Sequence, residues 1–159
     1  MTTPPGSQGR TFESPAQAVR KLTAVARSAP RLWFVYRGGL PPKLRERIIV
    51  GVSEANACAG CTRVHQRWAV RTGVSEDDLE ALGLGDLARL DERSRAAVVY
   101  AVERSQQNFA GSVDPEVKRA VTQHFGADAI EGIDAVARGI DSANLSVSGV
   151  GALRRRLGL

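Results

Sequence analysis

The 159-residue chain has few aromatic residues, one methionine, two histidines and two cysteines. It has no run of eighteen apolar residues, and it does not start with basic residues followed by an apolar stretch, so we expect neither a membrane span nor a secretory signal. The expected compartment is therefore the cytoplasm. There, a lone pair of cysteines is more often catalytic or metal-binding than a structural disulfide.

Basic residues exceed acidic ones, with a formal net charge of +5, but the two signs are mixed along most of the chain. The one basic cluster is Arg154-Arg155-Arg156, and no aromatic-studded basic motif accompanies it. This pattern is typical of a solvated, arginine-rich surface, and we expect no nucleic-acid partner. Gly83-Leu84-Gly85 is a lone glycine pair and not a dinucleotide motif, so no nicotinamide or flavin cofactor is expected.

Helical signals cover most of the chain and predict an all-α fold, a single helical domain of about seven helices joined by short connections. The stretch 48–52 is apolar enough for a buried strand, which leaves that segment open between helix and strand. We expect a flexible arm over residues 1–12, the helical domain over 13–145 and a basic tail over 146–159. The predicted helices follow the caps Ser14, Asn56, Ser75, Asp91 and Asp114, or cover residues 43–55 and 128–144.

The two cysteines lie three residues apart, and a histidine follows the second by four. On one helix, about 100° per residue places Cys58, Cys61 and His65 on a single stripe. Such a pair can cycle between dithiol and disulfide, with the histidine accepting a proton from Cys61. The alternative is that both cysteines are small apolar core residues, because free cysteine is often buried.

A helix start at Asn56 would place Cys58 in the first turn, where free amide groups favour a thiolate. A carboxylate would orient the histidine, and Glu46 and Glu54 are both candidates. In one straight helix, Glu54 would share the cysteine stripe, whereas Glu46 would lie about 18 Å from Cys58 along the axis. A break at Asn56 would let Glu46 approach instead. Each glutamate could also be an ordinary surface charge.

The pattern of Glu46, eleven residues, Cys58-Ala59-Gly60-Cys61, three residues and His65 resembles the alkylhydroperoxidase D branch of the carboxymuconolactone decarboxylase family. Weaker resemblance extends over residues 30–145. It implies an all-helical fold that assembles into homo-oligomers, often trimers or trimers of dimers. Gly60 is a departure, because well-studied peroxidase members carry a second histidine at that position.

The resemblance implies roles for four catalytic residues. Cys61 would be the thiolate that meets the hydroperoxide, Cys58 would complete the disulfide, and His65 with Glu46 would form a proton relay. The implied substrate is a hydroperoxide or a partner's disulfide, and the implied electron donor is a small dithiol or a dihydrolipoyl group. Lactone decarboxylation is disfavoured, because the decarboxylase branch generally lacks the cysteine pair.

Three other readings compete with a redox enzyme. A zinc site would use Cys58, Cys61, His65 and His124, although His124 can also be explained as a helix C-terminal histidine. Covalent haem is excluded because Thr62, and not histidine, follows the second cysteine. A non-catalytic oligomeric redox switch would use the apolar patch from Trp33 to Tyr36, which otherwise suits a core, a subunit contact or a wall for an apolar substrate.

Overall fold

The computed structural model describes residues 9–158, and within them the regular structure is helical, without strands. A π-helical turn at Val35–Gly39 and a 3-10 turn at Leu87–Arg89 supplement eight α-helices. The fold class is therefore all-α, as predicted. The helices are α1 (Pro15–Arg27), α2 (Ala29–Phe34), α3 (Pro42–Ala55), α4 (Ala59–Arg71), α5 (Glu76–Leu84), α6 (Glu92–Gln106), α7 (Pro115–Phe125) and α8 (Ala127–Arg156).

Four helix starts expected from the sequence are confirmed by side-chain caps. Ser14 and Ser75 accept hydrogen bonds from backbone N–H groups three residues later, at 3.2 Å in each case. Asp91 accepts from the N–H of Ser94 at 2.9 Å, and Asp114 caps α7. These caps satisfy amide groups that the first turn of a helix leaves without a partner.

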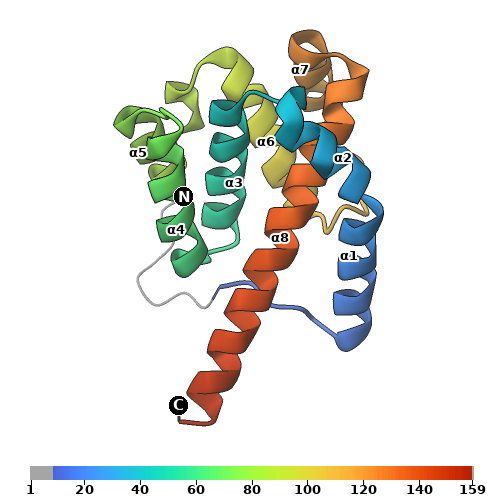
Figure 1. Cartoon of the computed structure of the whole chain (residues 1–159), viewed down its shortest axis with the longest axis vertical. Coiled ribbons are helices and arrows are strands. Elements are labelled where there is room, and N and C mark those ends of the chain that lie inside the picture. Colours follow the sequence, from blue (N-terminus) through green and yellow to red (C-terminus); the bar gives the residue numbers. More distant parts are fainter. Residues whose placement is uncertain (1–8, 159) are drawn as a thin grey trace.

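Helix α3 lies at the centre of the fold and packs against α4, α5, α6 and α8 (Figure 1). Its apolar run 48–52 is buried and helical, so this segment is a helix and not the buried strand that the sequence had left open. At Gly51 a Cβ atom would lie 2.7 Å from Cγ1 of Val98, so a glycine is needed for the close approach of α3 to α6. Surrounded on most sides, α3 buries eight of its fourteen residues, among them the polar Glu46 and Ser53.

The ends of the chain differ from the sequence-based expectation. Helix α8 does not stop at Asn144 but runs to Arg156, and its last turns extend beyond the other helices (Figure 1). Residues 1–8 of the expected arm lie outside the described residues, whereas Arg10 is bonded to Asn56 and Asn108 in the body. Pro30 lies in the first turn of α2, where a missing N–H costs no helical bond.

Side chains of the predicted apolar patch point in different directions. Val35 is fully buried, but Trp33, Phe34 and Tyr36 are each more than half exposed. The patch is therefore mainly a surface feature. Across residues 9–158, no helix combines the length and hydropathy required to cross a bilayer.

Candidate active site

The sulfur atoms of Cys58 and Cys61 form a disulfide, and the Cα atoms of the two residues lie 5.3 Å apart. Both residues are buried, with 3% and 8% of their surface exposed. The structure therefore describes the oxidised form of the pair. A bond between residues three apart closes only a short loop, so it adds little to stability by restricting the unfolded chain.

A sharp turn between α3 and α4 positions the cysteines. Ala57 has a left-handed backbone with φ of 53°, which is uncommon for a residue with a side chain. The N–H of Cys58 then donates to the carbonyl of Ser53 at 3.1 Å, while the carbonyl of Cys58 accepts from Thr62 at 2.9 Å. This turn reverses the chain, so α4 runs back along α3 instead of continuing it.

The predicted helix start at Asn56 is wrong by two residues. Cys58 itself is the N-cap of α4, and Asn56 is the buried C-cap of α3. Cys61 consequently occupies the first turn, where unsatisfied amide groups and the helix dipole favour a negative charge. The sequence placed Cys58 in the first turn, whereas the structure places Cys58 at the N-cap and Cys61 in the first turn. The helix start therefore favours a thiolate at Cys61 as well as at Cys58.

The reversal brings Glu46 beside His65. Oε2 of Glu46 lies 3.9 Å from Nδ1 of His65, and its Oε1 lies 3.5 Å from Nε of Arg45. The Glu46 side chain is only 8% exposed, and Oε2 has no hydrogen-bond partner among the described residues. The imidazole of His65 therefore faces a buried carboxylate oxygen that has no other donor within residues 9–158. His65 is 30% exposed, so it connects this carboxylate to the surface.

Glu54 lies elsewhere. Its Oε1 is 3.7 Å from the place that a Cβ atom at Gly83 would occupy, so the carboxylate faces α5. Burial raises the pKa of Glu54 above its ordinary value. A straight helix from α3 into α4 would have favoured Glu54, but the turn at Ala57 selects Glu46 as the neighbour of His65.

His124 does not join the cysteines. It lies near the end of α7, where its Nε2 is 3.9 Å from Oε1 of Glu92 and its ring meets the edge of Phe125 at 6.2 Å between centroids. Within residues 9–158, no group of three or more His, Cys, Asp or Glu side chains has an arrangement suited to a metal ion. The four-ligand zinc site considered from the sequence is therefore not assembled in this structure.

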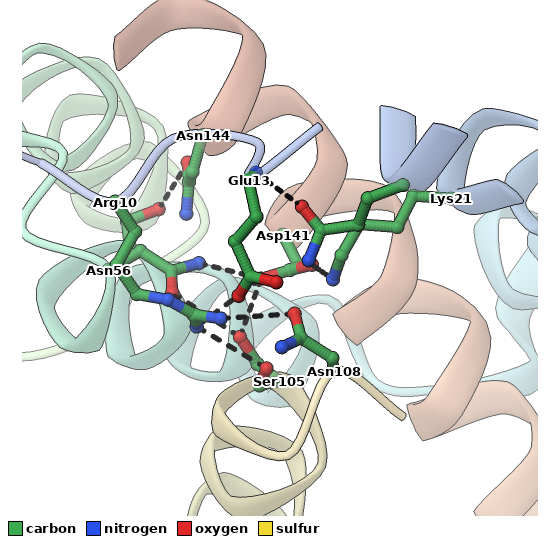
Figure 2. Close-up of polar contacts among 10 residues, drawn as sticks. Arg10, Glu13, Lys21, Asn56, Ser105, Asn108, Asp141 and Asn144 are labelled. Carbon is green, nitrogen blue, oxygen red and sulfur yellow. Dashed lines mark hydrogen bonds and ion pairs between the residues drawn. The ribbon is translucent and has the colours of Figure 1, made fainter. Parts of the chain in front are cut away.

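A buried polar network holds Asn56, the residue before the turn between α3 and α4 (Figure 2). Asp141 accepts from Lys21 at 2.6 Å, from Ser105 at 2.7 Å and from the Asn56 amide at 3.0 Å. Arg10 donates to the Asn56 side chain at 2.7 Å and to its backbone carbonyl at 3.0 Å. Asn56 is therefore held at both its side chain and its backbone, two residues before Cys58.

Sequence reasoning missed this network. One signal was present: in α8, Asp141 follows Ala137 by four residues and Ile133 by eight, so it falls on the buried stripe of that helix. A carboxylate on such a stripe needs a partner of opposite charge. The identity of that partner was not readable, because Lys21 lies 120 residues away.

Comparison with known proteins connects this geometry to a family. A model of the carboxymuconolactone decarboxylase family matches residues 22–103, which is about half of the chain. The matched segment includes α3 and α4, and thus both cysteines, His65 and Glu46. No curated protein matches the sequence.

Proposed function

The chain belongs to the carboxymuconolactone decarboxylase family, and we propose that it is a thiol-dependent oxidoreductase that reduces hydroperoxides, as in the alkylhydroperoxidase D-like branch. One observation carries the proposal. A redox-capable disulfide lies at the start of the same helix as a histidine, and the Nδ1 of this histidine lies 3.9 Å from a buried carboxylate oxygen, Oε2 of Glu46, that has no hydrogen-bond donor among the described residues.

In the proposed cycle, Cys61 of the reduced protein reacts first. Its thiol proton passes to His65, and the thiolate attacks the terminal oxygen of the hydroperoxide. An S–O bond forms, the O–O bond breaks, and the alkoxide leaves as an alcohol after taking the proton from His65. Cys61 is left as a sulfenic acid.

Cys58 then resolves this intermediate. Its sulfur attacks the Cys61 sulfur, the hydroxide leaves as water with the Cys58 proton, and the disulfide forms. A small dithiol or a dihydrolipoyl group reduces the disulfide and is itself oxidised to a disulfide. The sum is one hydroperoxide and one dithiol consumed for one alcohol, one water and one disulfide, with no resident cofactor.

The pair of Glu46 and His65 supports proton transfer in this scheme. A protonated His65 is an imidazolium, and the Glu46 carboxylate supplies the opposite charge next to it. Because Glu46 is buried while His65 is partly exposed, the histidine can exchange protons with solvent and the carboxylate stays in place. This division of roles is what a relay requires.

The test measures peroxide consumption by pre-reduced protein, with thiols counted before and after the reaction. Cys61→Ser should abolish consumption, whereas Cys58→Ser should allow one turnover and accumulate a sulfenic acid that dimedone traps. His65→Gln should slow the reaction, and His124→Gln is a matched control because the chain has only these two histidines.

The outcomes separate the alternatives. A Cys61→Ser protein that consumes peroxide as fast as the wild type would refute the mechanism. Reduction of a protein disulfide without peroxide turnover would favour a disulfide reductase. Disulfide-dependent assembly without any turnover would favour a non-catalytic redox switch.

We also propose that the chain works in the cytoplasm as a homo-oligomer. Two exposed apolar surfaces support the homo-oligomer. One is formed by residues of α2 and the adjoining π-helical turn. The other is a stripe along the protruding end of α8, formed by Val147, Val150, Leu153 and Leu157. Exposed apolar stripes of this kind are typical of protein contacts. Light scattering of wild type and Leu153→Glu is the test, and a monomeric wild type would contradict the proposal.

A further inference from the structure

A cavity lies apart from the cysteine pair, between α1, α8 and the turn after α6. Its volume is about 350 Å³, within the range of small-molecule sites. Figure 2 shows four of its lining residues, Glu13, Lys21, Asn108 and Asp141. None of its lining residues belongs to the proposed redox site.

Two side-chain amides in the lining have their oxygens already occupied. Oε1 of Gln17 accepts from the backbone N–H of Glu13 at 2.7 Å, and Oδ1 of Asn108 accepts from Arg10 at 3.2 Å. These contacts orient both amides so that their NH₂ groups are the ends left to donate. The two amides therefore contribute donors to the cavity.

The inner part of the cavity contains buried polar groups. Ser142 is 4% exposed, and its hydroxyl has no hydrogen-bond partner among the described residues. Lys21 is 8% exposed, and its ammonium group makes a bond to Asp141. An ammonium has three protons to donate, so this contact does not use all of them. Buried polar groups normally have partners, and an unpartnered one on a cavity wall indicates a polar ligand.

The charged residues that line the cavity have a net positive charge. Lys21 and Asp141 neutralise each other, which leaves Arg20 and Arg138 against Glu13. The Arg138 guanidinium also stacks over the Phe109 ring, 4.4 Å from its centroid. The Asp134 carboxylate lies between two arginines. Its Oδ2 is 3.5 Å from Nη2 of Arg138, and its Oδ1 is closer to Arg104, at 3.1 Å from Nε.

An aromatic ring forms part of the same wall. Phe109 has a left-handed backbone with φ of 59°, and its N–H donates to the carbonyl of Arg104 at 2.8 Å. For an aromatic residue this conformation is strained and persists only when its surroundings impose it. The strained turn places the ring in a cavity that Ala24 and Ala110 also line. The wall thus offers an apolar surface beside the donors.

We propose that this cavity binds a small organic carboxylate with a short aromatic or aliphatic body. Amide, hydroxyl and guanidinium donors suit the two carboxylate oxygens, and the single excess positive charge suits one negative charge. Phe109 and the alanines suit the body of the ligand. The proposal is independent of the redox function, because the two sites share no residue.

Benzoate and hexanoate are the probes, and benzamide and hexanamide are their neutral counterparts. Titration calorimetry of the full chain should give a dissociation constant of about 1 mM or tighter for a carboxylate. The neutral amides should bind at least roughly tenfold more weakly, because they lack the charge-assisted hydrogen bonds. Backbone amide shifts on binding should map to α1, α8 and residues 108–110.

Variants locate the site. Arg138→Gln and Ser142→Ala should each weaken carboxylate binding, the former by roughly tenfold. Arg20→Gln removes an exposed charge at the cavity without burying a new group, so it should fold normally and weaken binding too. Arg27→Gln is the matched control on the same helix, outside the cavity, and should leave binding unchanged.

Three results would overturn the proposal. One is that no carboxylate binds at millimolar concentration. Another is that amides or inorganic phosphate bind as well as the carboxylates. The third is that Arg27→Gln weakens binding as much as Arg20→Gln, which would indicate non-specific attraction to a basic surface.

Discussion

Replacing Glu46 with glutamine removes one charge and preserves the shape of the side chain. Glutamine retains an oxygen that can accept from His65 across the same turn between α3 and α4. Its amide is neutral, so it no longer balances an imidazolium. The substitution therefore isolates the electrostatic contribution of Glu46 to the proposed proton relay.

The size of that contribution follows from the distance. Two unit charges 3.9 Å apart interact by about 4 kcal/mol at an effective dielectric constant of 20, and by about 1 kcal/mol in water. Glu46 is buried but His65 is 30% exposed, so the value lies between these limits. We expect Glu46→Gln to slow peroxide reduction by roughly 10- to 100-fold.

Single-turnover stopped-flow measurement of pre-reduced protein isolates the thiolate step from reduction of the disulfide. Glu54→Gln is the matched control, since it makes the same chemical change eight residues later in α3 on a carboxylate that faces α5. Its rate should equal that of the wild type. If Glu54→Gln slows the step as much as Glu46→Gln, the geometric assignment of the relay is wrong.

Three further predictions concern other positions. Burial raises the pKa of Glu54, so the protein is most stable while this carboxyl is protonated and loses stability as the pH rises through the folded-state pKa. Glu54→Gln should therefore raise the melting temperature at pH 7, and this gain should disappear in acid. A gain that grows in acid would contradict the prediction. Gly60 faces open space, so Gly60→His should fold and increase peroxide consumption by roughly tenfold or more relative to Gly60→Ala, whereas equal rates would show that a second histidine is not limiting. Asp141→Asn leaves the Lys21 charge buried without its partner and should cost about 3 kcal/mol in urea denaturation, with recovery in Asp141→Asn/Lys21→Met; a loss below about 1 kcal/mol would contradict a buried ion pair.

Most of the secondary structure could be predicted because its signals are local. Ser14, Ser75, Asp91 and Asp114 each cap a helix through a backbone group two or three residues away, so a short stretch of sequence contains both partners. The end of α8 was missed for the same reason. Its glycines and arginines resemble a tail, and only the continuous helix shows that they extend it.

The cysteine pair and His65 were likewise readable, because three and four residues are the spacings at which helical neighbours meet. The sequence by itself determined an all-helical chain with a Cys-x-x-Cys and a histidine in one helix. The residue at which α4 begins could not be predicted from the sequence. Asn56 is a good N-cap by residue type, but its side chain is bound to Asp141 and Arg10, far away in the chain, and Cys58 takes the N-cap position instead.

Only the tertiary structure decided which carboxylate meets His65. The choice depends on the left-handed backbone of Ala57, where α4 folds back along α3. The 19 residues from Glu46 to His65 would span about 28 Å along a straight helix, but the fold brings the two side chains within 3.9 Å of each other. A single backbone angle is not encoded in a hydrophobic pattern or a spacing. The residue before Ala57, Asn56, is held by hydrogen bonds with Arg10, Ser105 and Asp141, which come together only when the whole chain is folded.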